Sequence, residues 1–119
     1  MTTPHRPAGI HLLADLGGVD AALLSEPSRI DALLREAALA AGARILHSHF
    51  HAFGPGMGVT GVLLLAESHI SIHTWPEHGF AAADIFMCGE ARPQRALELI
   101  EEALRPATRT VRTVERGQP

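Results

Sequence analysis

The sequence predicts an α+β fold, a two-layer sandwich in which two helices pack on one face of a mostly antiparallel sheet. Apolar residues recur at helical spacing in two segments. Around these segments, apolar runs alternate with polar residues or end at turn signals, as in strands. The predicted order is β-α-β-β-β-β-α-β, with strands at residues 9–16, 43–53, 59–66, 69–75, 80–88 and 108–115 and helices at 27–41 and 92–104.

The two helices have the clearest pattern. In 27–41, Ile30, Leu33 and Leu34 begin an apolar stripe that alanines continue, and Gly42 is placed to end the helix. In 92–104 a second stripe is made by Ala96, Leu99, Ile100, Ala103 and Leu104. Because each helix has one apolar stripe, both should cover the same sheet face, and the other face needs water or a partner.

The first three strands are predicted from composition and from the turns between them. Residues 9–16 are apolar and stop at a glycine pair, and 43–53 combine β-branched and aromatic residues in partial alternation. A glycine-rich loop, 54–58, separates this strand from 59–66, whose apolar run is typical of a buried strand.

The last three strands differ in expected burial. Ile70 and Ile72 alternate with polar residues, so 69–75 is predicted to be half-buried. Residues 80–88 form another strand. The final strand, 108–115, has a polar face, and we expect it at a sheet edge.

Length and composition narrow the class of protein. The 119 residues fit a single domain, 1–119, and 46% are hydrophobic, which excludes a disordered chain. A net charge of −3 argues against binding to a phosphate backbone. No signal peptide or membrane span is predicted, and the single cysteine fits a reducing compartment, so we expect a cytoplasmic protein.

The eight histidines indicate either metal binding or proton transfer. His47, His49 and His51 alternate on one strand, so their side chains share a face and suggest a zinc site, but a polar face is the commoner explanation. Ser68, His73 and Asp84 could in principle form a hydrolase triad. The strand-to-helix elbow that presents such a serine is missing, however, and we predict no metal.

A more specific pattern lies between Gly58 and Gly89. Glu67-Ser68-His69, the stretch Ile-Ser-Ile-His-Thr-Trp-Pro-Glu at 70–77, and Cys88-Gly89 closely resemble the short bacterial and archaeal S-adenosylmethionine decarboxylases. These are pyruvoyl enzymes that cleave themselves. The resemblance extends over nearly the whole chain and implies a decarboxylase that supplies aminopropyl groups for spermidine biosynthesis.

The resemblance implies roles for three residues. The chain is expected to cut itself between Glu67 and Ser68 into a β chain, 1–67, and an α chain, 68–119, with Ser68 converted into a pyruvoyl group. That group would form a Schiff base with the substrate amine. His73 corresponds to the proton acceptor in processing, and Cys88 to the proton donor in decarboxylation.

One geometric point follows from the spacing of these residues. Ser68 and His73 are five residues apart, so they should point to opposite faces of a regular strand. We therefore expect a bulge or turn near Ser68, or a base that acts from an irregular segment.

Further assignments rest on the same resemblance. Thr60 stands where relatives often have serine and is expected to assist processing. From the chemistry of the implied substrate, Phe53 and Trp75 are candidates for binding its adenine and its sulfonium, and Glu77 for binding its ribose hydroxyls or the sulfonium. Relatives often carry tyrosines where this chain has His78 and Phe80, so affinity or specificity could differ.

Several alternatives remain open at this point. The same pyruvoyl chemistry could act on ornithine or arginine, and an unprocessed homologue would be a non-catalytic binding protein. Family members are dimers of αβ units, so the resemblance implies a homodimer. The sequence does not define roles for His47, His49, His51, His69 and His78.

Overall fold

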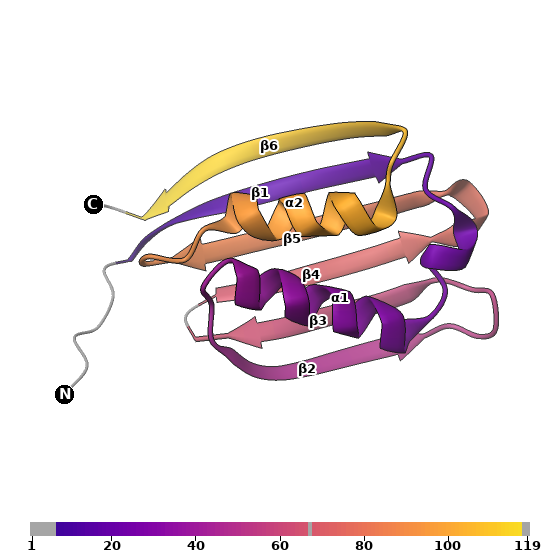
Figure 1. Cartoon of the computed structure of the whole chain (residues 1–119), viewed down its shortest axis with the longest axis horizontal. Helices are drawn as coiled ribbons and strands as arrows, with labels where there is room; N and C mark the ends of the chain where they lie inside the picture. The colour runs from indigo at the N-terminus through magenta and orange to yellow at the C-terminus, as the bar shows by residue number, and fades with distance from the viewer. Residues whose placement is uncertain (1–6, 67, 118–119) are drawn as a thin grey trace.

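A computed structural model describes residues 7–66 and 68–117 of the chain. Six strands and two helices follow in the predicted order (Figure 1). The strands are β1 (Ala8–Gly17), β2 (Ile45–Ala52), β3 (Val59–Leu65), β4 (Ser68–Trp75), β5 (Phe80–Cys88) and β6 (Thr108–Gly117), and the helices are α1 (Pro27–Ala40) and α2 (Pro93–Leu104).

All six strands form one antiparallel sheet in the order β2-β3-β4-β5-β1-β6. The first strand therefore pairs with the fifth and the last, far from its neighbours in sequence. The expected edge position of the final strand is confirmed, because β6 pairs only with β1. At the opposite edge, β2 contains one irregularity between Ile45 and His47.

Both helices lie on the same face of the sheet, which confirms the predicted two-layer sandwich (Figure 1). The core between the layers is aliphatic. From the helices it takes Ile30, Leu34, Ala37, Ala38, Ala96, Leu97, Ile100 and Leu104, and from the sheet it takes Leu12, Leu16, Leu63, Ile70, Ile72 and Ile85, among others. All of these side chains are buried, so their transfer from water is the main contribution to stability.

Two prolines mark the helix starts, and Gly42 ends the first helix as predicted. Pro27 and Pro93 each occupy the first turn, where a missing N–H costs no hydrogen bond. Gly42 follows the cap of α1 with φ 84°, a left-handed conformation that glycine adopts without steric cost. None of the helices in the described ranges is long and apolar enough to cross a membrane.

Two short 3-10 turns were not predicted. They span Ala21–Leu23 and Pro76–His78, and they carry the chain between β1 and α1 and between β4 and β5. Thr74 connects this region to the sheet: its hydroxyl donates to the Leu24 carbonyl (2.7 Å) and accepts from the Val59 N–H (2.9 Å). Thr74 is buried, so these bonds replace water that the hydroxyl lost on folding.

The sheet face opposite the helices, called the open face below, has a different composition. Strand register places six of the eight histidines there: His11, His47, His49, His51, His69 and His73. Exposed apolar side chains lie among them, with Leu64 44%, Trp75 40% and Val114 43% exposed. Of the functional residues predicted from the sequence, Thr60, His73, Trp75 and Cys88 belong to this face.

Candidate active site

The first part of the candidate site lies where β4 begins and β5 ends. These strands are antiparallel neighbours, so the N-terminus of one meets the C-terminus of the other. The Cys88 backbone N–H donates to the Ser68 hydroxyl oxygen at 3.3 Å, and both residues are partly buried. The structure thus places the only cysteine beside the serine predicted to become the reactive group. Glu67, on the other side of the predicted cleavage bond, lies outside the described residues.

The second part lies towards the other end of β4. Thr60 on β3 and His73 on β4 stand directly opposite each other in the register. The Thr60 hydroxyl is 3.1 Å from the His73 Nδ1 on the open face. A hydroxyl paired with an exposed imidazole can pass a proton to or from a group that lies above the sheet.

The structure does not bring Ser68 and His73 together within one chain. Pairing between β3 and β4 runs without interruption from Leu65–Ser68 to Thr60–His73. Our expectation of a bulge, a turn or an irregular segment between them is therefore wrong. Five residues of regular strand separate them by roughly 16 Å, and alternation places their side chains on opposite faces.

A shallow cavity of about 270 Å³ adjoins the Thr60–His73 pair. It contains all three of the predicted substrate-binding residues. Its lining consists of Phe53, Met57, Gly58, Thr60, His73, Thr74, Trp75 and Glu77. Phe53 is 59% exposed, so a wide aromatic surface is available to a flat ring or a cation. Glu77 adds a carboxylate at the same place.

A third group of side chains was not predicted from the sequence. His11, Phe86 and His69 occupy one row across β1, β5 and β4, and their rings are 5.6 to 5.9 Å apart between centroids. Burial, the neighbouring His11 and the charge of Arg116 lower the pKa of His69 from 6.5, and the Asp84 carboxylate opposes them. These effects together favour the uncharged imidazole at His69. The alternation of His11 with apolar residues was visible in sequence, but its pairing with β5 was not.

The other two chemical hypotheses gain no support from the structure. His47, His49 and His51 lie exposed on the edge strand β2, and within residues 7–66 and 68–117 no group of three histidine, cysteine or acidic side chains could hold a metal ion. The hydrolase triad is not assembled. His73 Nδ1 faces Thr60, whereas Asp84 pairs across the strands with Ser71.

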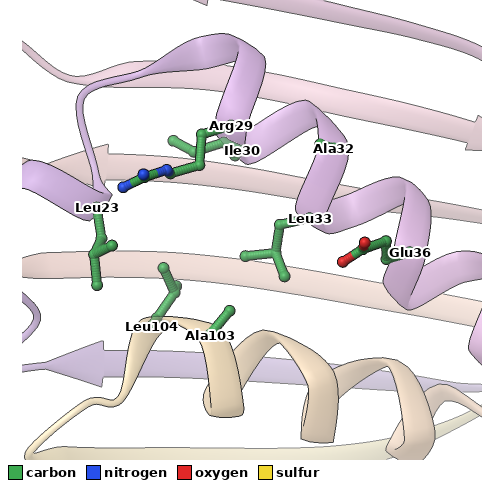
Figure 2. Close-up of a pocket in the computed structure, with 8 residues that line it drawn as sticks. All are labelled: Leu23, Arg29, Ile30, Ala32, Leu33, Glu36, Ala103 and Leu104. Carbon is green, nitrogen blue, oxygen red and sulfur yellow. The ribbon is translucent and has the colours of Figure 1, made fainter.

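A larger hollow, of about 430 Å³, lies in the helical layer (Figure 2). Leu33 of α1 and Leu104 of α2 point into the space between the helices, and Arg29 and Glu36 contribute its charged groups. Its lining contains no histidine, cysteine, serine or threonine. The hollow lies on the face opposite the Thr60–His73 pair, so we assign it no part in the chemistry.

Comparison with known proteins identifies the family. The family model described as S-adenosylmethionine decarboxylase matches residues 10–117. The S-adenosylmethionine decarboxylase proenzyme of a Sulfurihydrogenibium species is 48% identical over 110 residues, covering 92% of this chain and 82% of that protein. The proenzyme of Aquifex aeolicus is 46% identical over 110 residues, covering 92% of this chain and 81% of that protein.

A solved structure agrees with the sequence comparison. The crystal structure of the adenosylmethionine decarboxylase from Aquifex aeolicus superimposes with a TM-score of 0.87 at 42% identity, covering 96% of this chain and 94% of that one. The resemblance inferred from the motif around Ser68 is thus confirmed by similarity along almost the entire chain. The chain belongs to the S-adenosylmethionine decarboxylase family.

Proposed function

We propose that this protein is a self-processing, pyruvoyl-dependent decarboxylase that converts S-adenosylmethionine into its decarboxylated form and CO₂. The observation that supports this most directly is the hydrogen bond from the Cys88 N–H to the Ser68 hydroxyl. It places a candidate proton donor next to the candidate reactive residue. The relatives named above are called proenzymes, which agrees with a chain that must be processed.

Processing would begin with the Ser68 hydroxyl. Its oxygen attacks the Glu67 carbonyl carbon, the peptide C–N bond breaks, and an ester replaces the amide. A base then removes the Ser68 α-proton while the Cβ–Oγ bond breaks, which frees the Glu67 carboxylate. Tautomerisation, addition of water and loss of ammonia leave a pyruvoyl group on the chain 68–119.

The residues around Ser68 fit such a group. Ser68 is the first residue of β4, partly buried, and its oxygen already accepts a backbone N–H. When formed, the pyruvoyl group would act as an electron sink for the electrons that CO₂ leaves behind. Cys88 would then donate a proton to the substrate carbon. Proton donation by a positioned thiol is ordinary general acid catalysis.

His73 must reach Ser68 from another molecule, because roughly 16 Å of strand separates the two in one chain. A second copy is the natural source. If two open faces pack together around a twofold axis with their strands antiparallel, the His73 end of one copy covers the Ser68 end of the other. The partner's cavity and its Thr60–His73 pair would then complete the site.

The surface of the open face supports this assembly. Leu64, Trp75 and Val114 are exposed there, and both helices of the described ranges lie on the other face. A homodimer of cleaved units would bury these apolar side chains and would create two identical sites. We also expect the protein to work in the cytoplasm, where a reducing environment keeps the Cys88 thiol free.

Mass spectrometry and CO₂ release test the proposal together. We expect the purified chain to yield two fragments, 1–67 and 68–119, the second with a blocked terminus, and we expect Ser68→Ala to remain whole. The processed protein should release CO₂ from carboxyl-labelled S-adenosylmethionine. Release only from labelled ornithine or arginine would overturn the substrate assignment, and an uncut chain would overturn the self-processing mechanism.

A further inference from the structure

A fixed positive charge lies close to the Ser68–Cys88 end of the open face. Gly9 of β1 pairs with Cys88 on one side and with Arg116 of β6 on the other. Gly9 has no side chain, and a Cβ at this position would lie 2.9 Å from the Cys88 Sγ and 3.1 Å from the Phe86 ring. The glycine therefore allows the Cys88 thiol and the Phe86 ring to pack closely over β1, on the side of β1 opposite Arg116.

Two contacts hold the Arg116 side chain across β1, towards β5. Its guanidinium carbon lies 5.2 Å from the centre of the Phe86 ring, a cation–π distance. Its Nη1 is 3.4 Å from the His11 Nδ1. A guanidinium can only donate, so His11 Nδ1 accepts and the ring proton resides on Nε2.

The His11 ring keeps this orientation at a cost. Its Nε2 is buried and has no hydrogen-bond partner within the described ranges. A buried donor without an acceptor is unfavourable, and such groups are rare in folded proteins. The contact between His11 and Arg116 offers a reason for the orientation: the imidazole aims the guanidinium towards Phe86 and the Ser68–Cys88 end.

The proposed substrate has a group that matches this charge. S-adenosylmethionine carries an α-carboxylate on the carbon that bears the reacting amine, so the carboxylate must lie close to Ser68 and Cys88. A guanidinium recognises a carboxylate through two parallel N–H donors. Arg112, also on the open face of β6, is two side-chain positions farther from Cys88, beside Leu13.

We propose that Arg116 binds the α-carboxylate of the substrate and selects for an amino-acid substrate, with His11 and Phe86 as positioning residues. This inference rests on the decarboxylase function proposed above. It also predicts a kinetic signature. The carboxylate leaves as neutral CO₂, so Arg116 favours the bound substrate more than the transition state. Its loss should raise KM and should not lower kcat.

The product provides a sharp control, because it differs from the substrate only by the missing carboxylate. We expect Arg116→Gln to raise KM for S-adenosylmethionine at least tenfold, the scale of a lost hydrogen bond between charged groups. The inhibition constant of the decarboxylated product should change less than twofold. Arg112→Gln, the matched control on the same strand and face, should change neither constant.

Two results would overturn the inference. An equal rise in KM and in the product's inhibition constant would show that Arg116 supports the site structurally, and no change in either would show that it does not bind substrate. Mass spectrometry must first confirm that each variant is cleaved. If Arg116→Gln is not cleaved, Arg116→Lys is used in its place. We then expect a several-fold rise in KM and an unchanged inhibition constant for the product. An inactive wild-type enzyme would instead refute the proposed function.

Discussion

The two faces of the sheet use different chemistry although they alternate along the same strands. The helix-covered face is aliphatic and closed, with Ile70, Ile72 and Ile85 fully buried. The open face carries six imidazoles, a hydroxyl partner for His73 and several exposed apolar side chains. The stability of a single chain therefore comes from one face, and the residues assigned to chemistry lie on or beside the other.

Substitutions at the adjacent β4 residues Ile72 and His73 are the simplest way to compare the roles of the two faces. His73→Ala on the open face should abolish cleavage completely, because the proposed proton acceptor is lost. It should change the free energy of unfolding by less than about 0.5 kcal/mol, as is usual for an exposed side chain. Mass spectrometry measures cleavage, and urea unfolding in a Ser68→Ala background compares uncut chains. A His73→Ala protein that still cleaves would contradict the assignment.

Cys88→Ala should affect decarboxylation but not self-cleavage, although both reactions involve the same end of the sheet. The backbone N–H that holds Ser68 is retained, so we expect cleavage to continue. Decarboxylation should fall by about 10²–10⁴-fold, the range expected for a lost general acid. Single-turnover measurement of CO₂ release from the cleaved protein checks this. Full activity without the thiol would exclude Cys88 as the proton donor.

Ile72→Ala tests the covered face one residue before His73. The isoleucine is fully buried, so its truncation leaves a cavity and should destabilise the chain by about 2–5 kcal/mol. Urea unfolding in the Ser68→Ala background gives the free energy at a fixed protein concentration. A decrease in the free energy of unfolding below about 1 kcal/mol would show either that the helices move to fill the cavity or that this face is less tightly packed than described.

Thr74→Val tests the polar contact between the sheet and the segment before α1. The substitution keeps the shape but leaves the Leu24 carbonyl and the Val59 N–H without their partner. We expect the free energy of unfolding to fall by about 1–3 kcal/mol, measured by urea unfolding in the same Ser68→Ala background. Unchanged stability would mean that water replaces the hydroxyl at this buried position.

The smallest effect concerns pH. The pKa of His69 is lowered in the folded chain, chiefly by burial and then by His11, so the unfolded chain binds more protons as the pH falls. The contribution of His69 to the free energy of unfolding is fully present above pH 6.5. It is lost as the pH falls below that value. Unfolding free energies at pH 7.5 and 5.5 should therefore differ less in His69→Asn than in the parent chain. An identical pH dependence in His69→Asn and the parent chain would contradict the lowered pKa of His69.

Much of the fold followed from the sequence, because each element carries a local signal. The apolar stripes beginning at Ile30 and Ala96 defined both helices, and alternation around Ile70 and Ile72 defined β4. The 3-10 turns were missed because they are short and have no periodicity. The pairing of β1 with β5 and β6 was also out of reach, because register between strands distant in sequence leaves no local pattern.

The same limit applied to the candidate site. Ser68, His73 and Cys88 could be singled out because they belong to a long, specific motif. Their relative positions could not, since the question of a bulge depends on the register between β3 and β4. Arg116 and His11 come from opposite ends of the chain, and only the pairing of β6 with β1 brings them together.

The central claim is that one chain supplies Ser68 and Cys88 while its partner supplies His73 and Thr60. Co-expression of Ser68→Ala and His73→Ala chains with different affinity tags tests it most directly. Neither variant should cleave alone, but mixed dimers isolated through both tags should contain fragments 1–67 and 68–119 from the His73→Ala chain only. Mixed dimers in which that chain stays whole would contradict the claim.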